Sequence, residues 1–341
     1  MKSWSPSAGD TRSCSISRQR LIAEALRRRA ELTATGDLTA YRLVHGEADG
    51  IPGLAVDCYG EVAIVHAESA SILQDLLAAP DNPLPSVCET AYAKIHPRSV
   101  SRLSLDDRRR LAPEEPVWGP PCDKVEVSEH GVRYLVRPSA GLSVGLFLDM
   151  REVRNWLRGV SSGRTVLNLF AYTCSMGVCA SLGGARRVVN IDISRPYLEW
   201  GKANYALNGC LVDRQDFIYG DALDWLRRFA RRGLTFDLVI VDPPSFSSTP
   251  FSVTRDYPNL VAAAAPVVSS GGVLLAATNH TATSEARFDQ WLWSGLWQAK
   301  RGGRMIERWH EPAPDFPVVG RPYLKVRALE LNYVPVSQLA R

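Results

Sequence analysis

Residues 164–178 read RTVLNLFAYTCSMGV and begin a series of four related pieces. The others are RRVVNIDIS (186–194), FIYGDALDWL (217–226) and FDLVIVDPPSF (236–246). Each of these three is an apolar strand that delivers an acidic residue just past its carboxyl end, whereas the first delivers a small-residue turn at 171–177. In a doubly wound parallel sheet, such strand ends line a ligand-binding crevice where the strand order reverses. The sequence therefore places one turn and three carboxylates around one crevice: Asp192, Asp221 and Asp242.

The composition is that of a soluble globular protein. At 341 residues the chain is long enough for two domains, and 45% of its residues are hydrophobic. Seven cysteines without a CxxC pair and six histidines without metal-ligand spacing predict reduced thiols in a cytoplasm and no metal site. The polar start has no apolar core of a signal peptide, and no apolar run is long enough to span a bilayer.

The formal net charge of +4 permits a polyanionic partner without requiring one. Basic residues nevertheless cluster near the start, at Arg18, Arg20 and 27–29, and again at 108–110. Such clusters are either solvated helix faces or an RNA-facing surface, and the sequence leaves both interpretations open.

The first 140 residues are predicted to form a small α+β module that spans 16–140, behind a disordered tail at 1–15. Apolar residues at helical spacing predict a basic helix over 16–32. Turn signals such as Asp49-Gly50 and Pro52-Gly53 break the following stretch into short strands. The other elements expected in this module are strands within 41–66 and at 91–95, 125–127 and 132–136, and a Pro-rich loop at 113–121.

From residue 141 to residue 341 strands alternate with helices, which indicates a parallel sheet covered by helices on both faces. Pro196 early in one helix and Asn208-Gly209 after it mark the two ends of that helix. Gly271-Gly272 is expected to turn the chain into a strand. Helices are predicted at 150–160, 197–207, 222–229, 257–268 and 288–299, and further strands at 273–277, 305–309 and 323–331, the last two antiparallel. The predicted fold class is α/β, a Rossmann-like sheet preceded by the α+β module.

The turn at 171–177 suits a nucleoside ligand. Its small residues let backbone N–H groups and a helix N-terminus approach a ligand, but only Gly177 is a glycine, so the turn differs from the GxGxxG of a dinucleotide site. Asp192 is placed to accept from ribose hydroxyls, and Asp221 from an adenine amino group. Singly, these residues would merely end a strand or cap a helix; jointly, they favour a cofactor site.

The DPPSF turn predicts the acceptor side of the same crevice. Pro243 and Pro244 lack N–H donors, so the segment offers carbonyl oxygens and the carboxylate of Asp242 to a substrate amino or amide group. Phe246 could stack on a planar base. The alternative is an ordinary strand-ending turn with a core phenylalanine.

The pieces NLFAYTCSMGV, NIDIS, GDALDWL and VDPPSF resemble the successive motifs of class I S-adenosylmethionine-dependent methyltransferases. More closely, they are similar to the 23S ribosomal RNA methyltransferases of the RlmI and RlmK type. That family has the phrases N-[LC]-F-[AS]-Y-T and DPP-[ST]-F and a GLFLD-x-R-like segment, here 145–151. YRLVHGEADGIPGLAVDCYG (41–60) and DFPVV…YLK (315–325) extend the resemblance from Ile16 to the C-terminus.

The resemblance implies S-adenosyl-L-methionine as the cofactor. Asp192 would hold its ribose, Asp221 its adenine, and Asp242 would lie beside the sulfonium methyl. Transfer would be a direct displacement in which positioning supplies most of the acceleration. The implied cofactor-binding residues are Phe147, Asp149, Arg151, Asn168, Phe170, Tyr172, Asp192, Ile193, Asp221, Ala222 and Asp242. The candidate catalytic residues are Asp242, Pro243, Pro244, Phe246 and His280.

Two departures from the family pattern bear on the substrate. RlmI-type enzymes begin with a PUA RNA-binding domain, and the chain is expected to lack it because the stretch before residue 16 is too short. Cytosine carbon-5 methylation needs a cysteine nucleophile. The family's cysteine follows the strand after the Gly-Gly turn, and here that stretch reads Thr278, Asn279 and His280.

Without that cysteine, methylation of a ring nitrogen or an exocyclic amine is favoured, because neither needs a nucleophile. Cys174 and Cys179 lie in the cofactor turn and are expected to be small buried thiols. His280 either orients or deprotonates the acceptor or, like many lone histidines, is structural.

We therefore expect a soluble cytoplasmic methyltransferase that acts on an RNA base, specifically of ribosomal RNA, with no metal and no membrane partner. One alternative is a small-molecule acceptor, which the loss of an RNA-binding domain would permit. A further alternative is an RNA-associated factor that binds the cofactor without turnover. The intact DPPSF turn and the three carboxylates speak against the last interpretation.

Overall fold

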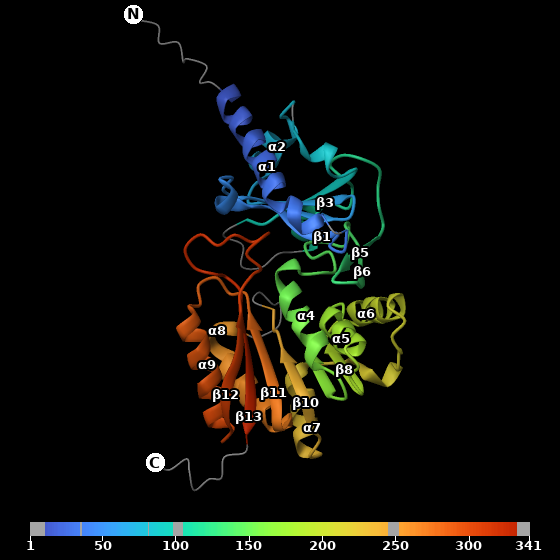
Figure 1. Ribbon diagram of the computed structural model, residues 1–341, viewed down its shortest axis with the longest axis vertical. Helices are drawn as coiled ribbons and strands as arrows, with labels where there is room; N and C mark the ends of the chain where they lie inside the picture. Colours follow the sequence, from blue (N-terminus) through green and yellow to red (C-terminus); the bar gives the residue numbers. More distant parts are fainter. Residues whose placement is uncertain (1–10, 35, 81, 98–104, 245–251, 333–341) are drawn as a thin grey trace, which may run out of the picture. The chain divides into compact units, whose positions relative to one another are not determined.

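In the computed structural model the chain divides into two units, and each unit is made of several chain segments (Figure 1). The structure describes residues 11–34, 36–80, 82–97, 105–244 and 252–332. Unit 1 consists of Met1–Gly131, Val136–Val144 and Ala313–Val319, and unit 2 of Val132–Leu135, Gly145–Pro312 and Gly320–Arg341. Helices and strands are mixed in both units, as the α/β prediction requires.

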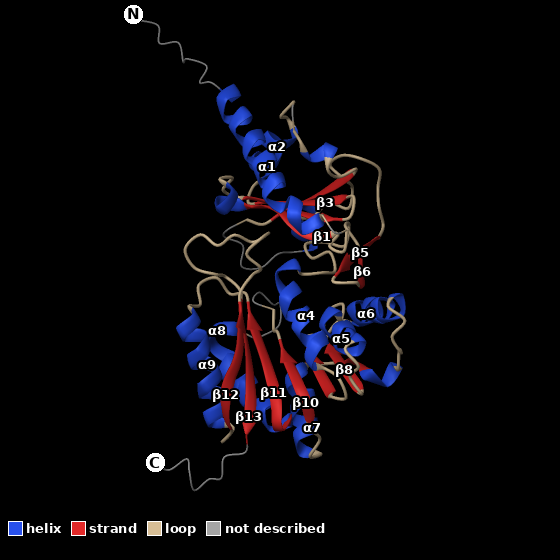
Figure 2. Cartoon of the chain, in the orientation of Figure 1, coloured by secondary structure: helices blue, strands red, loops and turns tan. Residues whose placement is uncertain are grey.

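Unit 1 is built on a four-stranded sheet with the order β1-β2-β3-β4, of which Figure 2 labels β1 and β3. β2 is antiparallel to both β1 and β3, and a short turn joins β2 to β3, whereas a helical crossover makes β4 parallel to β3. The strands predicted in this region are confirmed. The elements are α1 (Thr11–Thr33), β1 (Ala40–His45), β2 (Leu54–Tyr59), β3 (Val62–Ala67), α2 (Ala70–Leu77), β4 (Thr90–Ile95), α3 (Leu105–Leu111) and the two-stranded sheet of β5 (Val125–Glu129) and β6 (Val132–Val136).

One face of the four-stranded sheet packs against α1. Alternating strand residues such as Val56 and Val65 join Ile22 of the helix in one buried apolar cluster. The helix begins at Thr11 rather than at Ile16, because no proline or glycine between the two positions stops it. It therefore reaches into the segment expected to be a disordered tail.

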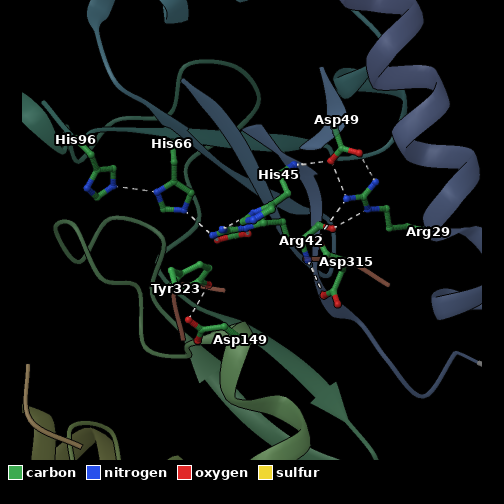
Figure 3. Close-up of polar contacts among 10 residues, drawn as sticks. Arg29, Arg42, His45, Asp49, His66, His96, Asp149, Asp315 and Tyr323 are labelled. Carbon is green, nitrogen blue, oxygen red and sulfur yellow. Dashed lines mark hydrogen bonds and ion pairs between the residues drawn. The ribbon is translucent and has the colours of Figure 1, made fainter. Parts of the chain in front are cut away.

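The basic residues of α1 make ion pairs within unit 1. Arg29 is only 1% exposed and donates two hydrogen bonds of 2.7 Å to the buried carboxylate of Asp49, which Arg28 also contacts (Figure 3). These contacts favour a structural role for the cluster over an RNA-facing one. The other pairs of this helix are Arg18–Asp75, Arg20–Glu24 and Arg27–Glu24.

Unit 1 also contains a segment from far along the chain, Ala313–Val319. The carboxylate of Asp315 accepts a hydrogen bond of 3.1 Å from the backbone N–H of Arg42, and Arg29 donates to the Asp315 carbonyl at 3.2 Å (Figure 3). Phe316 is buried beneath the guanidinium of Arg42, which lies 4.5 Å from the ring centroid. Asp315 and Phe316 are therefore buried within unit 1, although both flanks of their segment belong to unit 2.

Unit 2 is built on a seven-stranded sheet with the order β12-β13-β11-β10-β7-β8-β9. Strands β7 to β11 run parallel to one another, whereas β13 is antiparallel to both β11 and β12. The antiparallel pair predicted at the end of the chain is thus confirmed. The strands are β7 (Thr165–Leu169), β8 (Arg187–Asp192), β9 (Phe217–Tyr219), β10 (Phe236–Val241), β11 (Val268–Thr278), β12 (Gly302–Trp309) and β13 (Lys325–Asn332).

Helices cover both faces of this sheet, as predicted. α7, α8 and α9 share one apolar core with it, in which Leu226, Tyr257 and Phe288 are buried. α5 and α6 pack on the opposite face, where Asn190 of β8 contacts Tyr205. The helices are α4 (Arg151–Val160), α5 (Ser175–Leu182), α6 (Arg195–Leu207), α7 (Ala222–Arg231), α8 (Val253–Ala264) and α9 (Glu285–Gln298).

Two predictions in this unit were wrong in their bounds. The helix predicted at 257–268 is α8 (Val253–Ala264), because Pro266 cannot continue a helix and only a short 3₁₀ turn follows. Gly271-Gly272 does not turn the chain but lies inside β11, where the pairing with β10 shifts register. Gly271 has a φ of 74°, so this glycine pair makes a β-bulge.

Candidate functional site

The strand order of unit 2 reverses between β7 and β10. From β7 the chain proceeds outward through β8 to β9 and then returns to the other side of β7 as β10. The turn at 171–177 follows β7 and Asp242 follows β10, so both flank the reversal. Asp192 ends β8, and Asp221 follows β9. The turn and the three carboxylates thus lie at one edge of the sheet, as predicted, where open α/β sheets bind their ligands.

The turn after β7 has an unusual backbone. Phe170, Tyr172 and Cys174 adopt left-handed φ values of 55°, 50° and 59°, and none is a glycine. Each such residue costs on the order of 1–3 kcal/mol and persists only where its surroundings fix it. Here the N–H of Ala171 donates to the carbonyl of Ile191, which ties the turn to the end of β8.

Asp192 is held by the turn that it faces. Its two carboxylate oxygens accept 2.8 Å hydrogen bonds from the backbone N–H groups of Tyr172 and Ser194. Burial raises the pKa of Asp192 above its usual range, although these two donors oppose that shift. Each oxygen has a second lone pair, so a fixed carboxylate at this place could still accept from a ribose hydroxyl.

Beneath the turn, Gly177 allows α5 to lie close to β8. A Cβ at this position would lie 2.3 Å from Oδ1 of Asn190 and 2.6 Å from the hydroxyl of Tyr205. The amide of Asn168 donates to the same Asn190 oxygen at 2.9 Å. The structure therefore places Asn168 in a buried amide network under the turn.

Three aromatic rings, one of them in the turn, pack together and form an aromatic wall. The ring of Phe147, which is 48% exposed, lies 5.4 Å from that of Tyr172, and Tyr197 meets Tyr172 edge-on at 4.5 Å. The hydroxyl of Tyr172 is buried without a hydrogen-bond partner among the described residues. Such a wall, with one polar atom unsatisfied, fits a partly apolar ligand that offers a donor or acceptor.

The residues predicted to contact adenine follow β8 and β9. Ile193 follows Asp192 and is 55% exposed. Asp221 is exposed and caps α7 by accepting from the N–H of Asp224 at 3.1 Å, as the capping interpretation predicted, and Ala222 is buried behind it. The other Asp221 oxygen leaves room for the adenine contact.

The Gly145–Arg151 segment is anchored to the turn. A Cβ on Gly145, whose φ is 120°, would lie 2.3 Å from the Trp200 ring, and Thr173 donates to the Gly145 carbonyl at 2.6 Å. The side chain of Arg151 is buried, with Glu152 3.3 Å away. In the same segment Asp149 accepts a hydrogen bond from Tyr323, a residue that the sequence analysis did not single out (Figure 3).

Asp242, the residue predicted to face the acceptor, follows β10. Burial, followed by the charge of Asp149, raises the pKa of Asp242 to about 7. Pro243 is buried and Pro244 exposed, and Phe246 lies outside the described residues. A carboxyl with this pKa exchanges a proton near neutral pH, which is the range that general acid–base chemistry requires.

Tyr257 of α8 makes hydrogen bonds to the ends of two neighbouring strands, one of which precedes Asp242. Its buried hydroxyl donates to the carbonyl of Ala277 at 2.7 Å and lies 3.4 Å from that of Val241. The ends of β10 and β11 are thereby joined. The sequence analysis assigned no role to Tyr257, because nothing in its own helix identifies the two carbonyl partners.

His280 follows β11, the strand next to β10. Its Nδ1 lies 2.8 Å from Oγ1 of Thr283, and the carbonyls of both residues accept from the buried Lys325 ammonium at 2.9 Å. Burial, followed by the Lys325 charge, lowers the pKa of His280. The imidazole is therefore neutral at neutral pH. Lys325 therefore fixes the backbone of His280 and Thr283. In the sequence it was noted only as part of the YLK phrase.

The cysteines lie away from the acceptor side. Cys174 is buried against Gly201, where a Cβ would be 2.3 Å from its Sγ, and Cys179 lies 2.9 Å from the hydroxyl of Tyr134. The expectation of small buried thiols is confirmed for both. The last cysteine in the sequence is Cys210, so none follows β10 or β11.

Among the described residues, no group of three or more His, Cys, Asp or Glu side chains could hold a metal ion. No described helix is long and apolar enough to cross a membrane.

Comparison with known proteins gives concordant matches. Residues 87–330 match the profile of the S-adenosylmethionine-dependent methyltransferase family. The ribosomal RNA large subunit methyltransferase I of Salmonella arizonae is 31% identical over 307 residues, which cover 88% of this chain and 74% of the relative. The enzyme of the same name from Cronobacter sakazakii is 30% identical over 306 residues, covering 88% and 76%. Among solved structures, a methyltransferase complexed with SAH has a TM-score of 0.82 and 26% identity, covering 96% of this chain and 83% of that chain.

Proposed function

The chain belongs to the S-adenosylmethionine-dependent methyltransferase family, and within that family we propose that it methylates a base of ribosomal RNA at a nitrogen atom. It is an enzyme that uses S-adenosyl-L-methionine, as the family match and the resemblance to the SAH complex indicate. What we propose beyond this is the acceptor, a base of ribosomal RNA, and the methylated atom, a nitrogen.

The residues at the carboxyl edge of unit 2 fit this cofactor. We propose that Asp192 binds the ribose of the cofactor and that Asp221, Ile193 and Ala222 contact its adenine. The turn and the Gly145–Arg151 segment would contact the rest of the cofactor. The Tyr172 hydroxyl and the exposed side of the Phe147 ring support this assignment, since a ligand could bond to the first and cover the second. When bound, the cofactor supplies a methyl group on a positively charged sulfur.

On the acceptor side, Asp242 and the carbonyl oxygens of Pro243 and Pro244 would receive the N–H of a base. The carboxylate form of Asp242 accepts the proton that the acceptor nitrogen loses as it forms its new bond to carbon. His280, neutral and fixed through Thr283 and Lys325, would orient the same group. Phe246 would stack on the base plane.

The observation that carries the choice of nitrogen is the position of the cysteines. Carbon 5 of cytosine is activated only by covalent addition at the neighbouring carbon, which requires a thiolate nucleophile. No cysteine follows Cys210 in the sequence, and Cys174 and Cys179 are buried under the cofactor turn. Methylation of a nitrogen, which has its own lone pair, needs no such group.

The RNA part of the proposal is supported by the relatives. Enzymes that align with 88% of this chain are named as acting on large-subunit ribosomal RNA. A cytoplasmic location follows from the same proposal, since that is where the acceptor lies.

The proposal is tested by incubating the full chain with S-adenosylmethionine labelled on its methyl group and deproteinised ribosomal RNA. The RNA is then digested and its nucleosides are identified by mass spectrometry. We expect one N-methylated nucleoside and no 5-methylcytosine. Labelled 5-methylcytosine would refute the argument from the cysteines. No label in RNA, with cofactor binding intact, would refute the RNA acceptor and favour a small molecule.

The cofactor assignment has its own test. Asp192→Asn can accept only one of the two backbone N–H groups and carries no charge, so we expect cofactor affinity to fall by roughly tenfold or more in calorimetry. Arg304→Ala, which removes an exposed ion pair with Glu330, is the control and should bind normally. Unchanged affinity in Asp192→Asn would remove Asp192 from the site.

A further inference from the structure

Two asparagines of α6, Asn204 and Asn208, contact the backbone of β6 within unit 2. The side-chain oxygen of Asn204 accepts a hydrogen bond of 2.9 Å from the N–H of Leu135. That of Asn208 accepts a hydrogen bond of the same length from the N–H of Arg133. The two asparagines lie four positions apart and therefore on the same face of the helix. Their side-chain nitrogens, however, bond to different parts of the unit.

The Asn204 amide reaches the turn after β7. Its Nδ2 donates a hydrogen bond of 2.9 Å to the carbonyl of Thr173, and the residue is fully buried. Because its Oδ1 already accepts from an N–H, these two partners fix the orientation of the amide. Asn208 instead donates to the carbonyls of Arg133 and Asn204, at 2.7 and 2.8 Å, neither of which belongs to the turn.

The peptide bond between Thr173 and Cys174 is thereby fixed on both sides. Its carbonyl accepts from Asn204, and its N–H donates to the carbonyl of Ala171 at 2.7 Å. Tyr172 and Cys174, on either side of Thr173, both have a left-handed φ. A residue other than glycine keeps such a φ only where its surroundings hold it. The buried Asn204 amide is therefore one of the groups that hold this backbone.

The same turn contacts two other parts of the proposed cofactor site. The N–H of Tyr172 donates to the Asp192 carboxylate at 2.8 Å, and the hydroxyl of Thr173 donates to the carbonyl of Gly145 at 2.6 Å. A shift of the turn would therefore disturb Asp192 on one side and the Gly145–Arg151 segment on the other.

We propose that Asn204 is a positioning residue for the cofactor: its amide holds the turn after β7 in the conformation that binds S-adenosylmethionine. It acts through the Thr173 carbonyl rather than by contact with the ligand. A turn already held in its binding conformation loses little conformational entropy when the ligand arrives, so this hydrogen bond contributes to affinity. The inference rests on the proposed place of the turn in the cofactor site and does not depend on the acceptor.

The test is the affinity of the full chain for S-adenosylmethionine, measured by calorimetry in Asn204→Asp, with Asn208→Asp as the matched control. At alkaline pH the new carboxylate at position 204 still accepts from Leu135, but its second oxygen faces the Thr173 carbonyl and repels it. We expect the affinity to fall by roughly tenfold or more. Asn208→Asp damages the contact between α6 and β6 in the same way but not the turn, so its affinity should change by less than about threefold.

The pH profile separates this role from a merely structural one. When protonated, the new carboxyl group of Asn204→Asp has an O–H in the place of the natural N–H and can donate to the Thr173 carbonyl again. Burial raises the pKa of a carboxyl, so the affinity of this variant should approach that of the natural chain as the pH falls from about 8 to about 5.5. Asp192 and Cys174 also lie at the turn, but both are present in every variant, so the ratio to the natural chain removes their own titration.

Asn204→Ala and Asn208→Ala form a second pair, which serves if a buried carboxylate prevents folding. Asn204→Ala removes the same hydrogen bond without adding a charge. Its affinity relative to the natural chain should be roughly tenfold lower at every pH, whereas Asn208→Ala should lose less than about threefold.

Equal losses of affinity at positions 204 and 208 would indicate a general structural role and overturn the inference. So would unchanged affinity in the Asn204 variants, or an Asn204→Asp affinity that stays low at acid pH. Asp192→Asn shows separately whether the cofactor assignment holds, since that variant would bind normally if the assignment failed. Weak binding by Asp192→Asn together with normal binding by the Asn204 variants would refute only the role of Asn204.

Discussion

Asp242→Asn should make the protein more stable at alkaline pH while it removes activity. In the folded state the pKa of Asp242 is raised from 3.8 to about 7. The folded protein therefore holds this proton more tightly than the unfolded chain does, and it loses stability as pH rises from about 4 to about 7. Below pH 4 the carboxyl is protonated in both states and contributes nothing.

The size of the effect follows from that shift. A difference of about three pKa units, at roughly 1.4 kcal/mol each, sets an upper limit of about 4 kcal/mol above pH 7. Asp242 is half-buried rather than fully enclosed, and solvent screens part of its charge, so we expect about 2 kcal/mol. Asparagine has a similar shape and cannot ionise, and the variant should therefore gain this amount at pH 8 and only about a quarter of it at pH 4.5.

The assay is denaturant unfolding at both pH values, followed by tryptophan fluorescence, because most tryptophans lie in unit 2. Asp221→Asn is the matched control, since Asp221 is exposed and asparagine also caps helices. The reasoning is refuted if Asp242→Asn is less stable than the natural chain at pH 8. It is also refuted if the difference between the two is the same at both pH values.

The same variant should lack transfer activity at every pH. In the natural chain the rate should rise about tenfold per pH unit below pH 7 and level off above it, as the carboxylate form accumulates. A carboxyl kept at a cost in stability and needed for turnover is the pattern expected of an active-site group.

Two further predictions concern packing and a buried ion pair. Gly177→Ala should lower the free energy of unfolding by about 1–3 kcal/mol, because its Cβ has no room. Gly159→Ala, in open space on α4, should raise it by about 0.5–1 kcal/mol. Equal effects of the two variants in denaturant unfolding would contradict the close approach of α5 to β8. Asp49→Ala should cost about 3–5 kcal/mol, because it leaves Arg29 buried without its carboxylate. Arg20→Ala, which breaks an exposed ion pair, should cost less than about 1 kcal/mol in the same denaturant unfolding assay. A similar loss in both variants would show that burial does not determine the strength of these ion pairs.

The main elements of unit 2 could be predicted from local sequence because local chemistry determines them. Asn208-Gly209 ends α6 where the pattern indicates, and Asp221 caps α7. The position of Asp192 at the end of β8 followed from an apolar run of fixed length. Once a parallel sheet was expected, its strand ends had to share one edge, so the turn and the carboxylates could be brought together without coordinates.

Contacts between distant segments could not be predicted in the same way. The pairing of Tyr323 with Asp149, and of Lys325 with the turn of His280, joins residues whose own neighbourhoods give no sign of the partner. The prediction of a turn at Gly271-Gly272 was wrong for a different reason. A glycine with positive φ serves a turn and a bulge equally well, and only the register of β10 against β11 decides between them.

The placement of Ala313–Val319 has a consequence for any attempt to dissect the protein. A gene fragment that ends at Val144 encodes most of unit 1 but omits this segment, and with it the carbonyl that Arg29 contacts, the carboxylate that accepts from Arg42 and the buried ring of Phe316. A fragment that begins at Gly145 carries the segment without the residues that bury it. Each half made alone would therefore expose surface that the whole chain hides, so exchange of units between relatives requires junctions on both sides of Ala313–Val319 as well as those before Gly145.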